Sequence, residues 1–126
     1  MKKRVIATSL APAAVGPYSQ AVEINGTLYV SGQLPIDAQT GEFPAGGVKE
    51  HLVQIFKNIG YILNEAGYDF SDVAKSTVYL TDMKDFGALN EIYSQYFKEP
   101  YPARVAYAVK ELPKGALVEI DVIAAK

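Results

Sequence analysis

Apolar residues recur at steps of three and four between Val48 and Ala66, and this spacing is typical of an amphipathic helix. The stripe consists of Leu52, Ile55, Phe56, Ile59, Ile62, Leu63 and Ala66. One face of this helix is therefore expected to pack on the core. Gly67 follows the stripe and marks the helix end, because glycine readily adopts the left-handed conformation of a C-terminal cap.

A second helix is predicted to start near Asp82–Asp85, whose carboxylates can accept hydrogen bonds from the free N–H groups of a first turn. Its apolar stripe comprises Phe86, Leu89, Tyr93, Tyr96 and Phe97. Pro100 and Pro102 come after the stripe and end the helix, because proline lacks the backbone donor that a helix interior requires.

Six further segments have the composition of strands. They are Arg4–Thr8, Ala21–Ile24, Thr27–Ser31, Val73–Leu80, Arg104–Val109 and Leu117–Ala124. Asn25-Gly26 is the strongest short signal for a hairpin turn. Gly32–Gly47 is rich in glycine and proline and predicts a long loop. The order βββαβαββ is an α+β pattern.

The last predicted strand is apolar on both faces. Val118, Ile120 and Val122 point to one side, while Leu117 and Ile123 point to the other. A sheet that is apolar on both faces must be covered on both, and two helices cover only one. We therefore expect an α+β fold with a six-stranded mixed sheet, two helices on one face and other copies of the chain on the second face.

Composition narrows the function. The chain has 126 residues, 49% apolar and 21% charged, and reads as a single domain over residues 1–126. A net charge of -2 without a basic block argues against a nucleic-acid partner. No apolar run is long enough for a bilayer or a signal core, so we expect no membrane partner and a cytoplasmic location. The absence of cysteine and the single histidine argue against a thiol nucleophile and a typical zinc site, and we expect neither metal nor cofactor.

Arg104 is the first candidate for chemistry, because an arginine is unexpected inside a strand pattern. It shares a face with Ala106 and Ala108, whose small side chains leave space in front of the guanidinium. The planar guanidinium binds a carboxylate through two parallel hydrogen bonds, so Arg104 is a candidate anion-binding residue. The alternative is a structural arginine that pairs with an aspartate or glutamate across the sheet or a subunit interface.

Glu119 is the second candidate. It lies among apolar residues in the last predicted strand, and partial desolvation there raises the pKa of a carboxyl toward that of a useful base. The alternatives are an ion pair with Arg104 or a lysine, or an exposed side chain that alternates with Asp121.

Weaker signals surround these two residues. Gly32, after Ser31, allows close approach of a ligand to the backbone, although a plain strand end is an equal alternative. No Gly-x-Ser-x-Gly elbow surrounds Ser31, which argues against a nucleophilic serine. Tyr18 is expected to pack its ring on the sheet, and Asn90 to face solvent. His51, beside the first apolar stripe, is expected at the surface or an interface rather than in catalysis.

Several motifs recur along the chain in a familiar order. They are Ala11-Pro12-Ala13-Ala14, Gly16-Pro17-Tyr18-Ser19-Gln20, Ser31-Gly32-Gln33, Lys75-Ser76-Thr77-Val78-Tyr79, Asp85-Phe86, Pro102-Ala103-Arg104, Tyr107, Lys110, Leu112 and Val118-Glu119-Ile120. In residue types and spacing, this set resembles the reactive intermediate deaminases, also called Rid or YjgF-like proteins. The resemblance extends from about residue 4 to residue 126 without a large insertion.

The resemblance implies a chorismate-mutase-like (YjgF/RidA) fold and a homotrimer with pockets at its subunit interfaces. It also implies hydrolytic deamination of 2-iminobutanoate and 2-iminopropanoate to 2-oxo acids and ammonia. By resemblance, Arg104 binds the substrate carboxylate and Glu119 positions the attacking water. The residues that line the pocket by the same resemblance are Tyr18, Ser31, Gly32 and Asn90.

One position departs from the family's pattern. Many members carry a cysteine two residues after the arginine, where this chain has Ala106, so no thiol acts at this place. Two other functions stay open. A non-catalytic regulatory trimer would bind a small carboxylate at Arg104. RNA cleavage or translation inhibition is the other, and the acidic balance and lone histidine argue against it.

Overall fold

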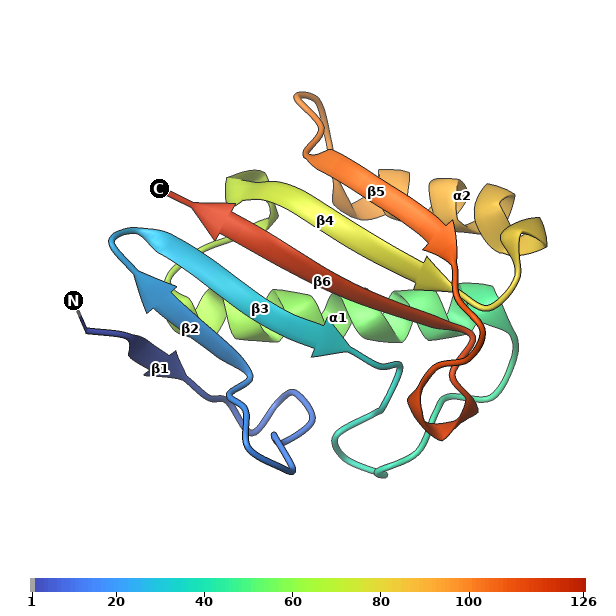
Figure 1. The fold of residues 1–126 in the computed structure, drawn as a ribbon, viewed down its shortest axis with the longest axis horizontal. Helices are drawn as coiled ribbons and strands as arrows, with labels where there is room; N and C mark the ends of the chain where they lie inside the picture. Colours follow the sequence, from blue (N-terminus) through green and yellow to red (C-terminus); the bar gives the residue numbers. More distant parts are fainter. Residues whose placement is uncertain (1) are drawn as a thin grey trace.

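A six-stranded mixed sheet forms the centre of the computed structural model, which describes residues 2–126. The strands lie side by side in the order β1-β2-β3-β6-β4-β5 (Figure 1). Their bounds are β1 Arg4–Ile6, β2 Ala21–Ile24, β3 Thr27–Gln33, β4 Val73–Leu80, β5 Ala103–Ala108 and β6 Val118–Ala125. β4 and β5 pair in parallel, whereas the other neighbours pair antiparallel. β5 is therefore an edge strand that the chain reaches by a crossover.

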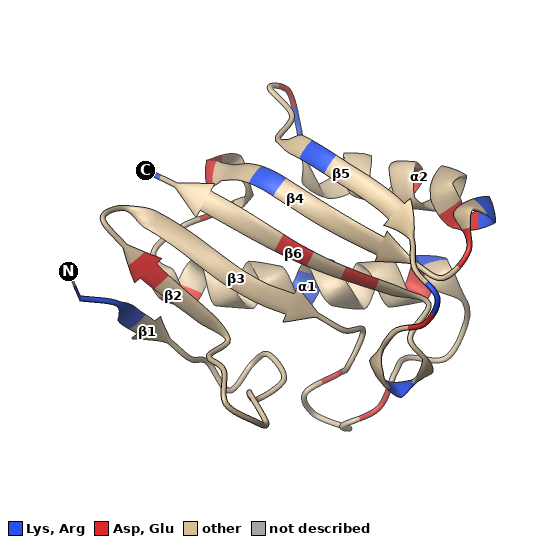
Figure 2. Ribbon diagram, viewed as in Figure 1, with Lys and Arg blue, Asp and Glu red and all other residues tan. Residues whose placement is uncertain are grey.

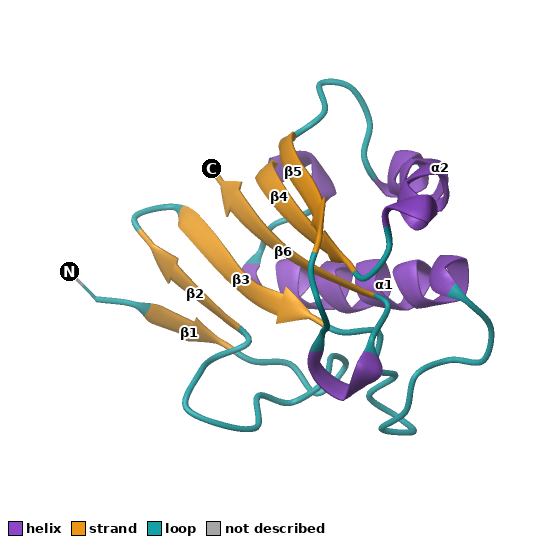
Figure 3. Cartoon of the chain, turned by 45° about the vertical axis from the view of Figure 1, so that its right-hand side comes forward, coloured by secondary structure: helices purple, strands orange, loops and turns teal. Residues whose placement is uncertain are grey.

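Both helices lie on the same side of this sheet, α1 (Val48–Ala66) along its middle and α2 (Phe86–Tyr96) near β4 and β5 (Figure 3). All seven stripe residues of α1 are buried. The helix ends at Gly67, whose φ of 85° is the left-handed cap predicted from the sequence. The core consequently lies in one layer between the sheet and the helices.

The order of elements and the bounds of α1 and β4 are confirmed. The predicted start of the second helix at Asp82–Asp85 is early, because Met83–Asp85 first forms a short 3₁₀ turn. The Asp82 carboxylate accepts a hydrogen bond from the Lys84 backbone N–H at 2.8 Å. The acidic cap thus belongs to this turn, and α2 begins after it.

The first strand is shorter than predicted, ending at Ile6 rather than Thr8. The cause is a side chain: the Thr8 backbone N–H donates to the Gln20 side-chain oxygen at 2.8 Å and so leaves the ladder. The predicted ends of the last two strands differ by one residue, since β5 begins at Ala103 and β6 at Val118.

The predicted loop start at Gly32 is wrong. β3 continues to Gln33, and its register with β6 shifts between Val30 and Gln33. Such an irregularity bends a strand and redirects its side chains. Ser31 and Gly32 therefore lie within the sheet, at the point where β3 is least regular.

His51 is buried, and the surface position expected for it is wrong within this chain. The residue is 7% exposed, and its Nε2 lies 3.2 Å from the Pro44 carbonyl oxygen. Its ring meets the Phe43 ring edge-on, with centroids 5.4 Å apart. His51 thus holds the loop that precedes α1 and takes no part in the site described below.

The two faces of the sheet differ in cover. On β6, Val118, Ile120 and Val122 are buried beneath the helices, and the residues between them face the other way. That open face exposes large side chains: Tyr29 is 46%, Val105 41% and Tyr107 44% exposed. Among residues 2–126, neither helix has the length and hydropathy needed to cross a membrane.

Candidate active site

Arg104 lies on the helix-covered face of the edge strand β5. Its register partner on β4 is the buried Ser76, and alternation places both beneath α2. An Arg104 Nη donates to the Asn90 side-chain oxygen at 2.9 Å. No carboxylate within residues 2–126 forms an ion pair with Arg104, so its charge is not neutralised inside the chain.

Two aromatic rings of α2 contact the guanidinium. Its central carbon lies 4.9 Å from the centroid of Tyr93 and 5.4 Å from that of Phe86. A cavity of about 340 Å³ opens beside it, lined by Asn90, Tyr93, Ser94, Tyr101, Pro102 and Arg104. A cation with free N–H donors next to a small cavity is suited to bind a small carboxylate.

Glu119 lies on the opposite face. It pairs in register with Tyr79, whose neighbours Val78 and Leu80 point into the core. Its carboxylate rests against the backbone of Gly32, so that a Cβ at this glycine would overlap it. Burial raises the pKa of Glu119, and the negative charge of Asp121 raises it further. Glu119 therefore holds its proton more tightly than an ordinary carboxyl, as a general base for water requires.

Asp121 and Tyr79 are neighbours of Glu119 that sequence reasoning did not identify as functional. The Tyr79 hydroxyl donates to the Asp121 carboxylate at 2.9 Å. Burial and this hydrogen bond raise the pKa of Tyr79 to about 12, so the phenol stays neutral. The two-residue spacing of Glu119 and Asp121 was the available signal, but the strand that pairs with them was not known from the sequence.

Ser31 and Tyr18 line one cavity on the Glu119 side. This cavity of about 600 Å³ includes Gly16, Pro17, Tyr29 and Ser31 in its lining, together with Tyr18. The Ser31 hydroxyl donates to the Ser19 carbonyl at 2.6 Å, which orients it and agrees with the exclusion of a nucleophilic serine. Tyr18 is 52% exposed rather than packed flat on the sheet, so its ring is open to a ligand or a partner.

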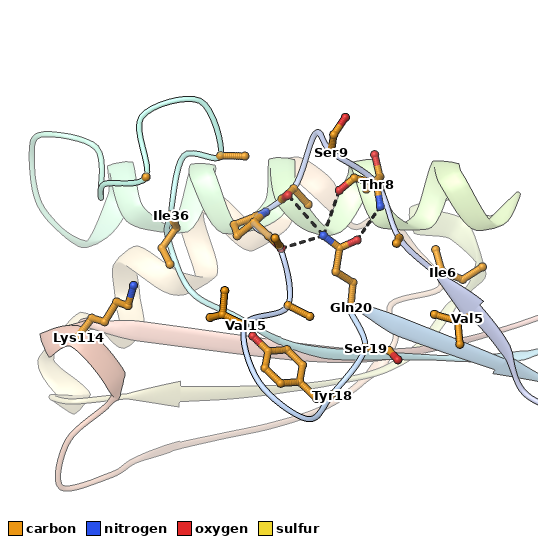
Figure 4. A pocket seen from close by; sticks show the side chains of 17 residues that line it. Val5, Ile6, Thr8, Ser9, Val15, Tyr18, Ser19, Gln20, Ile36 and Lys114 are labelled. Atoms are coloured by element: carbon orange, nitrogen blue, oxygen red, sulfur yellow. Dashed lines mark hydrogen bonds between the residues drawn. The ribbon is translucent and has the colours of Figure 1, made fainter.

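Gln20 holds the loop that carries Tyr18, and the sequence gave no sign of this role. Its side-chain nitrogen donates to the Thr8 and Pro12 carbonyls at 3.1 and 2.8 Å, as the dashed lines in Figure 4 show. The loop borders a larger, mostly apolar cavity of about 780 Å³ with Lys114 at one end (Figure 4). A buried amide that satisfies several loop carbonyls makes this loop a fixed wall.

The predicted site residues thus form two groups. Arg104 and Asn90 are brought together on the helix-covered face. Gly32 and Glu119 meet on the open face, next to Ser31 and the cavity that Tyr18 lines. β4 separates the strands of Arg104 and Glu119, and their side chains leave opposite faces of the sheet. One chain therefore presents two half-sites and no complete site.

Comparison with known proteins gives consistent matches over the whole chain. Residues 8–126 match the family described as Endoribonuclease L-PSP. A human protein named 2-iminobutanoate/2-iminopropanoate deaminase is 52% identical over 122 residues, covering 97% of this chain and 89% of the relative. The crystal structure of RidA from the Antarctic bacterium Psychrobacter superposes with a TM-score of 0.94 at 48% identity, covering 98% of this chain and 99% of that one. Escherichia coli TdcF with bound serine gives 0.92 at 39% identity, with 98% of each chain covered.

Proposed function

The chain belongs to the Endoribonuclease L-PSP family, and on this premise we propose that it hydrolyses 2-imino acids, including 2-iminobutanoate and 2-iminopropanoate, to 2-oxo acids and ammonia. Curated relatives that bear the name of this deaminase are 52–53% identical to it over 97% of its length. The observation that carries the proposal is the Arg104 guanidinium, held by a neutral amide and facing a cavity without a protein carboxylate to neutralise it.

Arg104 binds the substrate carboxylate in this proposal. Its hydrogen bond to Asn90 uses one donor and leaves others for a two-point grip on the acid. Bound serine in the Escherichia coli relative supports a site for a small amino-acid-like carboxylate. Asn90, predicted to line the pocket, then serves by fixing the arginine as well as by bordering the cavity.

Glu119 supplies the base. A protonated imine carbon is electrophilic, and Glu119 takes a proton from the attacking water as its oxygen adds to that carbon. The resulting carbinolamine receives the proton on nitrogen, ammonia leaves with the C–N electron pair, and the hydroxyl oxygen becomes the carbonyl of the 2-oxo acid. One C=N bond and one water thus become one C=O bond and one ammonia, with no change of oxidation state.

The two half-sites meet when two copies pack together, and we propose a homotrimer with one pocket at each interface. The exposed Tyr29, Val105 and Tyr107 support burial of the open face against a partner. Figure 2 shows basic and acidic residues on different strands of the sheet, β5 carrying Arg104 and β6 carrying Glu119. In a closed ring, Arg104 of each copy serves the Glu119 half of its neighbour.

Ribonuclease activity, which the family description names, receives no support from this chain. Its net charge is -2, and its single histidine is buried against Pro44 and Phe43. RNA binding normally needs a basic surface, and none of the half-site residues provides a row of cations.

Replacing Arg104 with alanine tests the proposal. Imine is generated in place by an amino-acid oxidase, and its loss is followed as semicarbazone or released ammonia. Arg104→Ala is expected to lower kcat/KM by at least about a hundredfold, since losing one partner of a desolvated charge pair costs roughly 3–5 kcal/mol. Arg104→Lys is nearly as poor, because lysine lacks the planar fork.

Circular dichroism and native mass serve as controls for folding and assembly of these variants. An Arg104→Ala enzyme that keeps most of the wild-type kcat/KM would remove the carboxylate role of this residue. Retention of product binding without any turnover in the wild-type protein would instead favour a non-catalytic carboxylate receptor.

A further inference from the structure

The guanidinium of Arg104 rests on two rings of α2, and these rings have no assigned role. We propose that Phe86 and Tyr93 form an aromatic cradle whose function is to hold Arg104 in the orientation that grips the substrate carboxylate. They are positioning residues, since they act through Arg104. The inference rests on the proposed function and adds to it the means by which one chain prepares its anion-binding half.

The contacts follow from helical spacing. Phe86, Asn90 and Tyr93 occur at steps of four and three residues and therefore share the face of α2 that overlies β5. The Arg104 central carbon lies 5.4 Å from the Phe86 centroid and 4.9 Å from the Tyr93 centroid, and Asn90 accepts a hydrogen bond between them in sequence. One helix face thus meets one arginine at three points.

Tyr93 is itself fixed in place. Its hydroxyl and the Ser76 hydroxyl are 2.7 Å apart, and both residues are buried. Its ring packs against Phe97 and Phe56, with centroids 4.5 and 5.9 Å away. Because Ser76 is also the register partner of Arg104 on β4, the same strand pair aligns the arginine and the ring beneath it.

Aromatic contacts suit this task for a chemical reason. A ring attracts the cation through its π face and consumes no N–H donor, so the donors remain available for the ligand. A free arginine side chain loses much rotational freedom when it binds, and a cradle removes that loss before the substrate arrives. The expected result is tighter binding of any carboxylate, with little effect on the chemical step.

Three variants remove parts of the cradle: Phe86→Leu, Tyr93→Phe and Ser76→Ala. Phe86→Leu is expected to raise KM and the Kd for 2-oxobutanoate, measured by calorimetry, about tenfold, while kcat stays within about twofold. Tyr93→Phe keeps the ring but frees it from Ser76, and is expected to raise the same constants about threefold. Ser76→Ala is expected to match Tyr93→Phe, because each removes the same hydrogen bond.

Phe70→Leu is the matched control. Phe70 packs in the same aromatic cluster, with its centroid 5.6 Å from Tyr96 and 5.5 Å from Phe97, but does not contact Arg104. It is expected to lower the melting temperature as the cradle variants do, with unchanged KM. In an Arg104→Ala background, the cradle variants are expected to have no further effect on 2-oxobutanoate binding.

The outcomes separate the two hypotheses. If Arg104→Ala leaves binding and activity intact, the proposed function of Arg104 fails and the cradle has no object. If Arg104→Ala abolishes binding while Phe86→Leu and Tyr93→Phe behave like Phe70→Leu, the cradle is overturned and the proposed function stands. If Phe86→Leu does not fold, Tyr93→Phe and Ser76→Ala, which change only one buried hydroxyl each, decide the matter.

Discussion

The two faces of the sheet prepare their halves of the site in different ways. On the helix-covered face, Arg104 already has an amide and two aromatic rings from its own chain around it. On the open face, Glu119 has no ion-pair partner within residues 2–126 and shares its surface with exposed tyrosines. The anion-binding half is thus completed by folding, whereas the base half awaits a second chain.

This difference separates affinity from turnover. Interactions built into the fold of one chain govern how well a carboxylate is held, since they exist before any assembly. The chemical step depends on the geometry between chains, because the water must lie between Glu119 and a carbon held by a neighbour's arginine. Changes on the open face should therefore affect rate and assembly together, and changes beneath α2 should affect binding.

The largest effect is expected from a charge placed on the open face. Val105→Asp puts a carboxylate on the exposed edge strand, where assembly would bury it unpaired, so the protein is expected to become monomeric. Imine hydrolysis then falls to the background rate, because the half-sites no longer meet. Native mass spectrometry and the imine assay measure this. Gln95→Glu, which adds the same charge at an exposed position of α2, serves as the control and should stay oligomeric.

Mixing two inactive variants tests whether the halves come from different chains. Arg104→Ala and Glu119→Gln, co-expressed with different tags, are expected to recover about a quarter of wild-type activity, because random mixing in a ring places an intact Arg104 beside an intact Glu119 at about one interface in four. Recovery no greater than the sum of the parent variants would place both residues in a site made by one chain.

Glu119→Gln alone is expected to lower kcat about a hundredfold, with a much smaller change in KM, because the amide keeps the size of the side chain but accepts no proton. Steady-state kinetics on the assembled variant measure both constants. A rise confined to KM would make Glu119 a binding residue.

The smallest effect is a shift of the pH profile. Activity needs ionised Glu119, so kcat falls as the pH decreases through the raised pKa of this carboxyl. Asp121→Asn removes one of the charges that raise it, and the acid limb is expected to move to lower pH while the rate near neutrality changes within about threefold. Tyr79 and Tyr107 face the same region but stay neutral over this range. Movement of the limb to higher pH would contradict the assigned influence of Asp121.

Sequence patterns predicted the fold better than the site. The bounds of α1 follow directly from its apolar stripe and Gly67, since periodicity and capping are local properties. The side on which Arg104 and Glu119 lie is not local. Alternation assigns faces within each strand, but the relation between two strands depends on the register through β4, which the sequence does not encode in any short motif.

The supports of Arg104 were missed for a similar reason. Phe86 and Tyr93 were correctly placed in the apolar stripe of the second helix, and nothing local distinguishes a ring that packs in the core from one that also contacts a cation. Asn90 was expected to face solvent, and it is exposed, yet its oxygen lies 2.9 Å from the arginine. Only the crossover that sets α2 above β5 brings these residues together.

Gly32 has a consequence for inheritance. An added methyl group would meet the flexible end of Glu119 rather than the backbone, so Gly32→Ala would displace the base and leave the fold intact. Such a chain would still offer a sound Arg104 to its neighbour. It would silence only the pocket to which it lends Glu119, and in a cell with one normal and one altered copy of the gene the loss would follow gene dosage rather than poison every assembly.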